Sequence, residues 1–317
     1  MKAVGVAVRN FVGPGETPDV DALLRYAVRA EELGFESLWV WDHVLLGVDP
    51  AYPILESLSV LAALAVRTER VRLGTSVLVL PLREPVVTAK VLATIDRLSK
   101  GRLIVGVAPG WYKREFDAVG VPYEERGRRL DRAIEIITRL WTERPLDLIA
   151  EPHRLRSAVM LPAPVQNPRP PLLIGGYVDR ALRRVARLGD GWLTYFYTPD
   201  SVRRSVERIR RYARELDRDP DEISVTNEVA ILVGEGGARD EDAMRSWLET
   251  EWDLSKGSDS TFDHAITGPA DECARRLREH FEAGVDRLVL VPYRYQLDQV
   301  ERIAQDVLPS LKLEHAR

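Results

Sequence analysis

The chain has 317 residues, of which 45% are hydrophobic and 30% are charged, and its formal net charge is −4. This composition is ordinary for a globular protein with a sizeable core, and it offers no basic field that would attract nucleic acid. The single cysteine, Cys273, excludes an internal disulfide and a cysteine-based metal cluster. No apolar run approaches the roughly 20 residues that span a bilayer, and no signal-peptide pattern is present, so we expect a cytoplasmic protein without membrane contact.

Strand-like and helix-like segments alternate along the whole chain. Expected strands cover residues 3–8, 36–41, 71–79, 103–107, 172–174, 191–194, 223–233 and 287–291. Expected helices cover residues 20–33, 54–66, 85–98, 126–141, 179–188, 201–216, 240–252, 270–283 and 297–311. Eight strands, each followed by a helix, predict an α/β fold, a (β/α)8 TIM barrel formed as one domain by residues 1–317.

A doubly wound open sheet is the structural alternative. It would need a glycine-rich turn after an early strand, and the first strand here leads into Arg9-Asn10-Phe11 instead. Two connections exceed normal barrel loops and are expected to be insertions. Residues 146–171 are rich in proline and are expected to be extended or hairpin-like, whereas residues 234–268, with glycines and a polar run at 256–260, are expected to help cover the site.

Small polar residues and glycines follow several of the predicted strands. The runs are 39–43, 73–81, 105–111 and 173–176. Because the carboxyl ends of barrel strands form one catalytic face, these runs predict a single site built from several strand ends. Thr75 and Ser76 place a hydroxyl and backbone amides there, and the run ending at Trp111 offers open backbone and a flat aromatic wall.

His43 is the sharpest single candidate for chemistry, because it follows a strand directly and is preceded by Asp42. An imidazole at that place can act as an acid, a base or a hydrogen-bond donor near neutral pH, although a loop histidine without chemistry is the plainer interpretation. The five histidines show no metal-binding spacing, so we expect no metal site. A serine hydrolase is disfavoured because the G-x-S-x-G turn is missing.

Gly175 and Gly176 lie between a short strand and the helix expected at residue 179. Glycines allow close approach to the backbone, and a helix amino terminus favours an anion, so this turn suits a phosphate, although a plain tight turn is equally open. Arg83, Tyr293 and Arg294 also follow strands and could contact an anionic substrate, or could be surface residues.

Over nearly its whole length the chain resembles the bacterial luciferase-like monooxygenase superfamily, and within it most resembles the branch that uses the deazaflavin coenzyme F420. The matching motifs, in order, are Asp42-His43, residues 73–77, residues 96–103, residues 106–111 with Glu115-Phe116, residues 164–166, Pro170-Pro171, Gly175-Gly176 and residues 188–192.

The resemblance implies a barrel that binds a flavin or deazaflavin at its carboxyl mouth. Members of the deazaflavin branch carry a non-proline cis peptide behind the ring, which maps onto Ser76-Val77. The family's Asp-His pair maps onto Asp42 and His43, and its phosphate contacts onto Gly175 and Gly176. By the same resemblance, Thr75, Ala108, Gly110 and Trp111 belong to the cofactor pocket.

The chain departs from the family at three positions. The sugar-phosphate dehydrogenases of the branch carry an acidic glutamate where this chain has Trp111, so a sugar phosphate is not the expected substrate. Ala108-Pro109 replaces a more flexible pair that usually contains glycine. Trp41 is bulkier than the small residue usually found before Asp-His, and we expect it to narrow the substrate pocket.

The prediction is therefore an oxidoreductase, in the form of a homodimer, that transfers a hydride between coenzyme F420 and a small organic substrate. The predicted catalytic residues are His43, which donates or accepts the accompanying proton, and Asp42, which orients the ring or the imidazole. One alternative is a monooxygenase that uses reduced FMN and oxygen. An alternative from another class is a flavin-binding protein without catalysis, in which His43 has no role. A third possibility is an unrelated barrel hydrolase, which would bind no cofactor. The sequence does not identify the substrate.

Overall fold

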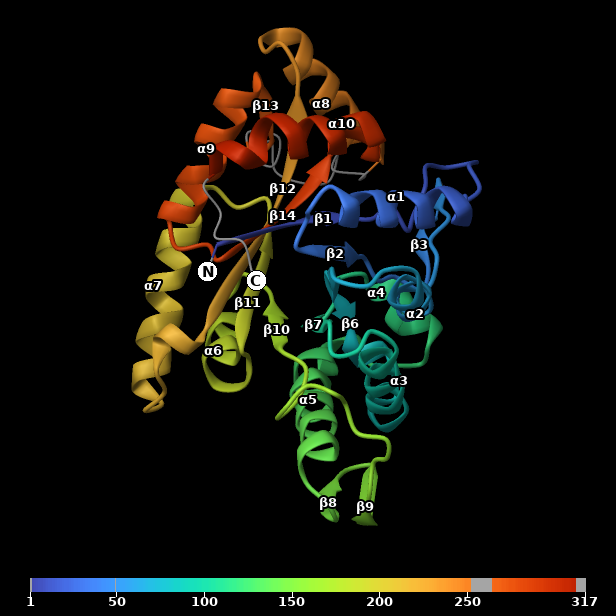
Figure 1. The fold of residues 1–317 in the computed structure, drawn as a ribbon. Coiled ribbons are helices and arrows are strands. Elements are labelled where there is room, and N and C mark those ends of the chain that lie inside the picture. Colours follow the sequence, from blue (N-terminus) through green and yellow to red (C-terminus); the bar gives the residue numbers. More distant parts are fainter. Residues whose placement is uncertain (1, 49, 252–263, 312–317) are drawn as a thin grey trace.

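The computed structural model describes residues 2–48, 50–251 and 264–311. Eight parallel strands form a barrel (Figure 1): β1 (Ala3–Ala7), β2 (Ser37–Val40), β5 (Arg72–Thr75), β7 (Leu103–Ala108), β10 (Leu172–Gly175), β11 (Gly191–Tyr195), β12 (Ser224–Val233) and β14 (Arg287–Pro292). Neighbours pair in chain order, β14 pairs with β1, and β7 pairs with β10, so the sheet closes on itself. The (β/α)8 barrel expected from the sequence is confirmed.

Helices surround the strands, as the alternating pattern predicts. They are α1 (Val20–Glu32), α2 (Ser57–Arg67), α3 (Pro85–Leu98), α4 (Lys113–Ala118), α5 (Arg126–Thr142), α6 (Asp179–Leu188), α7 (Pro199–Glu215), α8 (Ala238–Glu251), α9 (Ala270–Glu282) and α10 (Leu297–Arg302). Beyond α10 the coil continues as a π turn over Ile303–Val307 and a 3₁₀ turn over Leu308–Leu311. The short helix α4 was not predicted.

One large side chain of the barrel packs against glycines of the neighbouring strands. Trp39 of β2 is 1% exposed and lies against β1 and β5. A Cβ atom on Gly74 would lie 2.3 Å from Trp39 Cε3, and one on Gly5 would lie 2.9 Å from Trp39 Nε1. The indole nitrogen donates to Ser37 Oγ at 2.8 Å. The lumen is therefore a packed core, and any site must lie at an open end.

The third predicted strand is interrupted in the structure. Residues 71–79 were expected to be continuous, but β5 ends at Thr75 and the short strand β6 (Leu78–Val79) resumes after a cis peptide between Ser76 and Val77. The cis linkage expected from the family resemblance is thus confirmed. β5 pairs with β2 on one side and with β7 on the other, and β6 resumes the pairing with the end of β7.

The helix expected at residues 54–66 begins later than predicted. Ile54 instead forms an antiparallel bridge with Phe11. The Glu56 carboxylate caps the helix by accepting from the Leu58 and Ser59 amides at 3.2 and 2.7 Å, so α2 begins at Ser57. A carboxylate at this place satisfies amides that have no partner within the helix.

Two residues of the family motifs form hydrogen bonds that join neighbouring segments at the amino ends of the strands. Arg102 donates to the carbonyls of Ala65, Thr68 and Val71 at 2.7–2.8 Å, which closes the end of α2. The buried Asp96 accepts from the Val165 amide at 2.6 Å and so holds the chain that leads into β10. These motif residues stabilise the barrel on the side away from the mouth.

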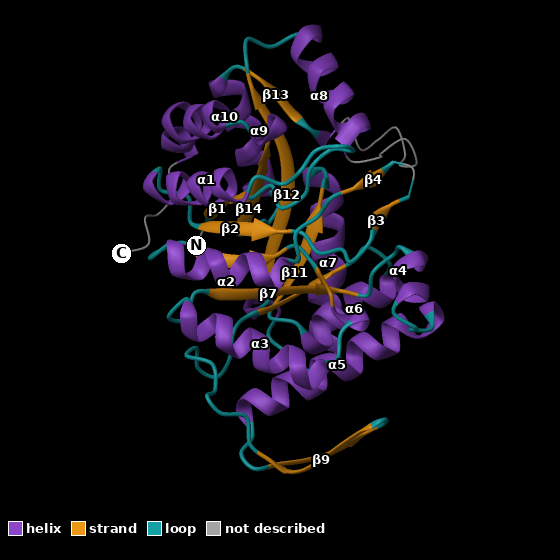
Figure 2. Cartoon of the chain, turned by 90° about the vertical axis from the view of Figure 1, so that its right-hand side faces the viewer, coloured by secondary structure: helices purple, strands orange, loops and turns teal. Residues whose placement is uncertain are grey.

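Two antiparallel hairpins extend from the barrel. β3 (Leu46–Gly47) and β4 (Ala51–Tyr52) lie at the side toward which the β2 arrow points in Figure 2. The segment 146–171, predicted to be extended or hairpin-like, contains β8 (Leu146–Ala150) paired with β9 (His153–Ala158), and this hairpin projects beyond α5. In the segment 234–268, α8 is followed by β13 (Ile266–Gly268). The polar run at 256–260 lies outside the described residues.

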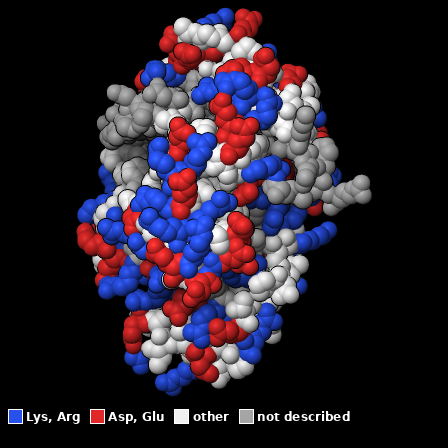
Figure 3. Space-filling view, turned by 90° about the vertical axis from the view of Figure 1, so that its left-hand side faces the viewer, with Lys and Arg blue, Asp and Glu red and all other residues white. Residues whose placement is uncertain are grey.

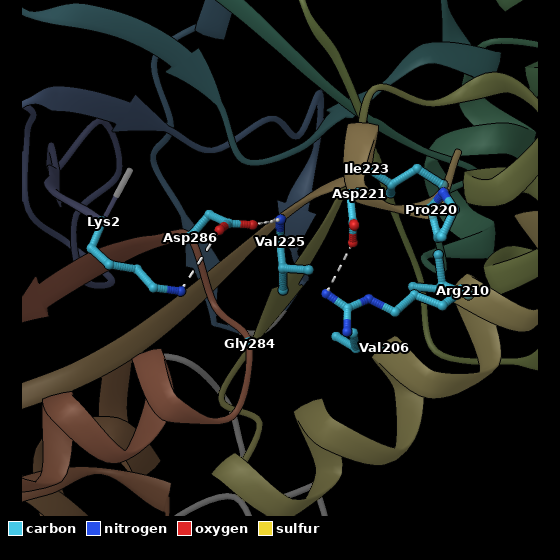
Figure 4. A pocket seen from close by; sticks show the side chains of 10 residues that line it. Lys2, Val206, Arg210, Pro220, Asp221, Ile223, Val225, Gly284 and Asp286 are labelled. Carbon is cyan, nitrogen blue, oxygen red and sulfur yellow. Dashed lines mark hydrogen bonds and ion pairs between the residues drawn. The ribbon is translucent and has the colours of Figure 1, made fainter. Parts of the chain in front are cut away.

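The surface and the amino end of the barrel are polar. Figure 3 shows acidic and basic side chains interspersed on the face that carries α7 and α9. A hollow at the amino end is bordered by Lys2, Arg210, Asp221 and Asp286 (Figure 4), and its charges form the pairs Lys2–Asp286 at 3.7 Å and Arg210–Asp221 at 3.6 Å. Within the part of the chain that the structure describes, no helix is long and apolar enough to cross a membrane.

Candidate active site

Turns that follow neighbouring strands meet at the carboxyl mouth. A Cβ atom on Gly175 would lie 3.2 Å from Val77 Cγ1 and 3.3 Å from Ala108 Cβ. Gly110 has a φ of +79°, and a Cβ atom there would lie 2.5 Å from Val79 Cγ1. The segment around the cis peptide, the end of β7 and the end of β10 are therefore in direct contact, and glycines allow their backbones to approach closely.

His43 forms a pair with a carboxylate that the sequence analysis did not single out. Its Nδ1 lies 3.0 Å from Glu115 Oε2. Glu115 is 1% exposed and also accepts from the backbone amides of Val44 and Leu45 at 2.5 and 3.0 Å. The Trp111 ring packs edge-on against the imidazole, with centroids 6.0 Å apart. The imidazole is thus fixed on one side by a carboxylate and covered by an indole.

This contact decides which nitrogen of His43 is available. Burial alone would raise the pKa of Glu115, but hydrogen bonds from His43 and from the Leu45 and Val44 amides outweigh it and hold the pKa below its usual value. The carboxylate is therefore ionised at neutral pH and can only accept, so Nδ1 carries a proton. In the neutral imidazole, Nε2 is then left as an acceptor, and no hydrogen bond from the described residues occupies it. Nε2 of His43 is therefore the nitrogen that can accept a hydrogen bond or a proton from a bound molecule.

Asp42, the other half of the predicted pair, has both carboxylate oxygens engaged. Oδ1 accepts from Ser57 Oγ at 2.8 Å and from an Arg83 nitrogen at 2.6 Å, and Oδ2 accepts from the Val79 amide at 2.8 Å. The residue is 3% exposed. Asp42 therefore joins the start of α2, Arg83 and the segment after the cis peptide.

The hydroxyl groups beside the cis peptide are also engaged. Thr75 Oγ1 donates to the Gly106 carbonyl at 2.7 Å and accepts from the Gly106 amide at 2.9 Å, so it joins β5 to β7. Ser76 Oγ bonds to a carboxyl oxygen of Glu228, which lies on β12. Glu228 is 2% exposed, and burial raises its pKa to about 8, although hydrogen bonds from Ser76 and Trp41 oppose the shift.

Aromatic side chains line one side of the mouth. Trp41 packs edge-on against Phe11 and Tyr295, with ring centroids 5.4 and 5.8 Å apart. Trp247 of α8 packs against Tyr295 and Tyr293, with centroids 5.7 and 5.5 Å apart. These rings come from the ends of β1, β2 and β14 and from α8. Such a wall favours apolar or planar ligands.

A second aromatic group follows β10 and β11. Tyr177 stacks on Tyr197 with centroids 5.0 Å apart and packs against Tyr195 at 5.4 Å. Beside it, Gly176 has a φ of +132° and its carbonyl accepts from the Trp192 indole at 2.9 Å. The first turn of α6 has no side-chain cap at Val178. The amino end of α6 thus keeps backbone amides that suit an anion.

The three residues predicted to contact an anionic substrate are not gathered into one cluster. Arg83 pairs with Asp42 and lies 2.9 Å from Glu56, so its charge is balanced within the protein. Tyr293 belongs to the aromatic wall, and Arg294 is exposed and lies over the Tyr293 ring at 5.3 Å. Among the described residues, no group of three histidine, cysteine or acidic side chains could hold a metal ion.

Two carboxylates of the mouth, Glu115 and Glu228, were missed by the sequence analysis. Glu115 lies within a quoted family motif, but its contact with His43 depends on the fold. Glu228 could have been found, because it is the only charged residue in the otherwise uncharged strand 224–233. A carboxyl group in a buried strand is costly unless it is partnered, and such groups gather at functional sites.

This arrangement is that of (β/α)8 barrel proteins whose site lies at the carboxyl ends of the strands. Within that class, the chain belongs to the luciferase-like monooxygenase family, whose model matches residues 3–287. The family expected from the sequence motifs is confirmed.

Relatives with different cofactors match the chain. An uncharacterized protein of Mycobacterium tuberculosis is 36% identical over 55% of this chain, and the match spans only 59% of that protein's length. An F420-dependent glucose-6-phosphate dehydrogenase of Amycolatopsis mediterranei is 27% identical over 92% of this chain and 94% of its own. An FMNH2-dependent dimethylsulfone monooxygenase of Pseudomonas putida is also 27% identical, over 94% of this chain and 90% of its own.

Solved structures share the fold at lower identity. An F420-dependent secondary alcohol dehydrogenase, in complex with an F420–acetone adduct, superposes with a TM-score of 0.82 at 19% identity, covering 99% of this chain and 100% of its own. A monooxygenase from Streptomyces bottropensis superposes with a TM-score of 0.81 at 24% identity, covering 98% of this chain and 99% of its own.

Proposed function

We propose that this protein is an oxidoreductase that moves a hydride between the deazaflavin coenzyme F420 and a small organic substrate. The broader statement, an oxidoreductase that uses F420 or FMN, is supported by relatives of both kinds that match almost the whole chain. The observation that carries the proposal is the His43–Glu115 pair, which leaves an acid–base nitrogen open at the mouth of a luciferase-like barrel.

The residues around the mouth fit a flat ring with a phosphate-bearing tail. Val77 and Ala108 both pack closely on Gly175, so the segment after the cis peptide and the ends of β7 and β10 form one surface on which a ring could lie. The amino end of α6 suits the phosphate. The residues proposed to hold the cofactor are Thr75, Ser76, Val77, Ala108, Gly110, Trp111, Gly175 and Gly176, supported by Asp42.

The cofactor, when bound, supplies the hydride chemistry. The protein contributes position and a proton. His43 Nε2 takes up or delivers the proton that accompanies reduction or oxidation of the substrate, and Glu115 keeps Nδ1 protonated so that Nε2 is the reacting nitrogen. Asp42 acts on the geometry of the mouth, through Val79 and Arg83, rather than on the substrate.

The substrate class follows from the walls of the mouth. Trp111 occupies the position at which the sugar-phosphate dehydrogenases of the resembled branch carry a glutamate, and 67% of its surface is exposed. At the ends of β1, β2 and β14, Trp41 packs edge-on against the buried rings of Phe11 and Tyr295. We therefore propose an apolar or aromatic carbonyl, alcohol, enone, imine or nitro compound, and not a sugar phosphate.

An FMN-dependent monooxygenase is the second candidate, because the Pseudomonas putida relative is as similar over the same length. Titrating the purified protein with F420 and with FMN, followed by cofactor fluorescence, separates the two. Saturable binding of F420 with much weaker binding of FMN is the expected result. Tight binding of FMN without binding of F420 would replace this proposal with the monooxygenase.

Catalysis is tested by His43→Ala. General acid–base groups contribute about 10²–10⁴-fold to rates, so turnover should fall by roughly that factor while cofactor affinity changes little. His153→Ala is the matched control, since His153 lies on the projecting hairpin and binds Glu84 at 2.9 Å. If His43→Ala turns over substrate as fast as the wild type, the assignment of His43 is wrong. If neither the wild type nor the variant turns over any of the proposed compounds, a flavin-binding protein without catalysis becomes the better interpretation.

We further propose a homodimer that works in the cytoplasm. A solution mass near that of one 35.8-kDa chain, measured by light scattering, would contradict the dimer.

A further inference from the structure

Glu228 reaches across the barrel lumen. In the closed sheet, β12 and β5 are separated by β14, β1 and β2 on one side and by β11, β10 and β7 on the other. Nevertheless the Glu228 carboxyl bonds to Ser76, which directly follows β5. This contact is possible only if the side chain points inward at the level of the mouth. Glu228 therefore lies at the floor of the site, beside the segment proposed to support the cofactor ring.

Its surroundings differ from those of the other buried carboxylates of the mouth. Asp42 has Arg83 as a cationic partner, and Glu115 has His43. Glu228 is bonded only by the uncharged donors Ser76 and Trp41, and no charged side chain of the described chain stabilises its anion. A buried carboxyl group without a cation is expected to hold its proton.

The side chains beside Glu228 on the neighbouring strands also provide no cation that would stabilise its anion. Tyr195 on β11 is its register partner, and Val289 is its partner on β14. Tyr177, which follows β10, has a pKa raised well above its usual value, first by burial and also by interactions with Tyr195, Tyr197 and Glu228. The surroundings are thus phenols, an indole and a hydroxyl. Burial raises the pKa of Glu228 to about 8, within the working range of a laboratory titration.

We propose that Glu228 is a positioning residue of the cofactor site, which in its neutral form fixes Ser76 and Trp41 across the lumen and on ionisation weakens the binding of the anionic cofactor. This inference rests on the proposed function, because it needs a phosphate-bearing cofactor at the mouth. An unpaired negative charge under that cofactor repels it through a poorly solvated interior, and such an interaction reduces affinity on the order of tenfold.

The test is the dissociation constant of F420, and separately of FMN, measured by fluorescence from pH 6.5 to 9.5. For the wild type we expect affinity to fall about tenfold as the pH passes roughly 8. Glu228→Gln keeps the size of the side chain and cannot ionise, so its affinity should follow only the titration of the cofactor itself. Glu207→Gln, on the exposed face of α7, is the matched control and should behave as the wild type.

Ser76→Ala provides a second variant. It removes a hydrogen bond that lowers the pKa of Glu228, so the loss of affinity should move to higher pH. A wild-type pH profile that coincides with the Glu228→Gln profile would overturn the inference, as would a Ser76→Ala inflection at the wild-type pH. These outcomes leave the proposed function intact. Failure of both cofactors to bind at any pH would instead remove the proposed function, and this inference with it.

Discussion

Replacing Glu228 with glutamine should change how the stability of the protein depends on pH, without any cofactor present. In the folded protein, burial raises the pKa of Glu228 from 4.5 to about 8. Between these values the unfolded chain releases the proton and the folded protein retains it. The wild type therefore loses stability as the pH rises from about 4.5 to about 8, and the loss is complete above the folded pKa.

The magnitude follows from the size of the shift. Each pKa unit corresponds to about 1.4 kcal/mol, so between pH 5 and pH 8.5 the free energy of unfolding should fall by about 4 kcal/mol through this one group. Because glutamine does not titrate, Glu228→Gln lacks this contribution. Relative to the wild type, the variant should thus gain about 4 kcal/mol in free energy of unfolding between the two pH values.

Urea unfolding at pH 5 and pH 8.5, followed by circular dichroism, measures the difference. The quantity to compare is the change in free energy of unfolding between the two pH values, taken for the wild type minus the variant. The contributions of all other titrating groups cancel in this difference. Glu207→Gln, on the exposed face of α7, serves as the control and should show the wild-type dependence. If Glu228→Gln and the wild type lose stability in parallel, Glu228 is not neutral in the folded protein and the reasoning fails.

Three further substitutions test the packing around Trp39, the hydrogen bonds of Arg102 and the ion pair of Asp42. Gly74→Ala places a Cβ atom 2.3 Å from Trp39, so the free energy of unfolding measured in urea should fall by about 1–3 kcal/mol, and Trp39→Phe in the same chain should restore part of it. Arg102→Ala leaves the carbonyls at the end of α2 without their charged donor and should cost about 2–4 kcal/mol in the same assay; an unchanged midpoint would show that these bonds contribute nothing. Asp42→Asn removes one of the two anionic partners of Arg83, Glu56 being the other, and should cost about 1–3 kcal/mol, measured by urea unfolding, whereas a purely catalytic Asp42 would leave stability unchanged.

The barrel could be predicted from the sequence because its strands are buried on both faces. Their apolar runs are bounded by glycine, proline and polar residues, and that pattern does not depend on distant contacts. The predicted bounds are wrong where contacts between residues distant in the sequence determine the start or end of an element. The strand expected at 71–79 breaks at the cis linkage after Ser76, and its pairing with β7 resumes at Leu78. The helix expected from residue 54 starts at Ser57, because Ile54 bridges to Phe11.

The site could be predicted only in part. Position after a strand was enough to place His43 at the mouth, and the family motifs were enough to expect the cis linkage at Ser76. The pairing of His43 with Glu115 joins residues 72 positions apart, and that of Ser76 with Glu228 joins residues 152 apart. Closure of the barrel brings such partners together. The strand pattern predicts a closed barrel, but it does not specify which side chains meet inside it.

Glu228 has no cationic partner, although cationic side chains are plentiful in this chain. The chain contains 45 lysine and arginine residues. Its other acidic groups at the strands have partners: Glu36 accepts two bonds from Arg287 at 2.9 and 3.0 Å, and Asp42 is held by Arg83. A fold that places arginine beside these carboxylates, and leaves the buried Glu228 with only Ser76 and Trp41, keeps that group neutral. The mouth thus holds two carboxylates with cationic or histidine partners, Asp42 and Glu115, beside the protonated Glu228, which is how a single site can provide a base-orienting anion and an uncharged floor at the same pH.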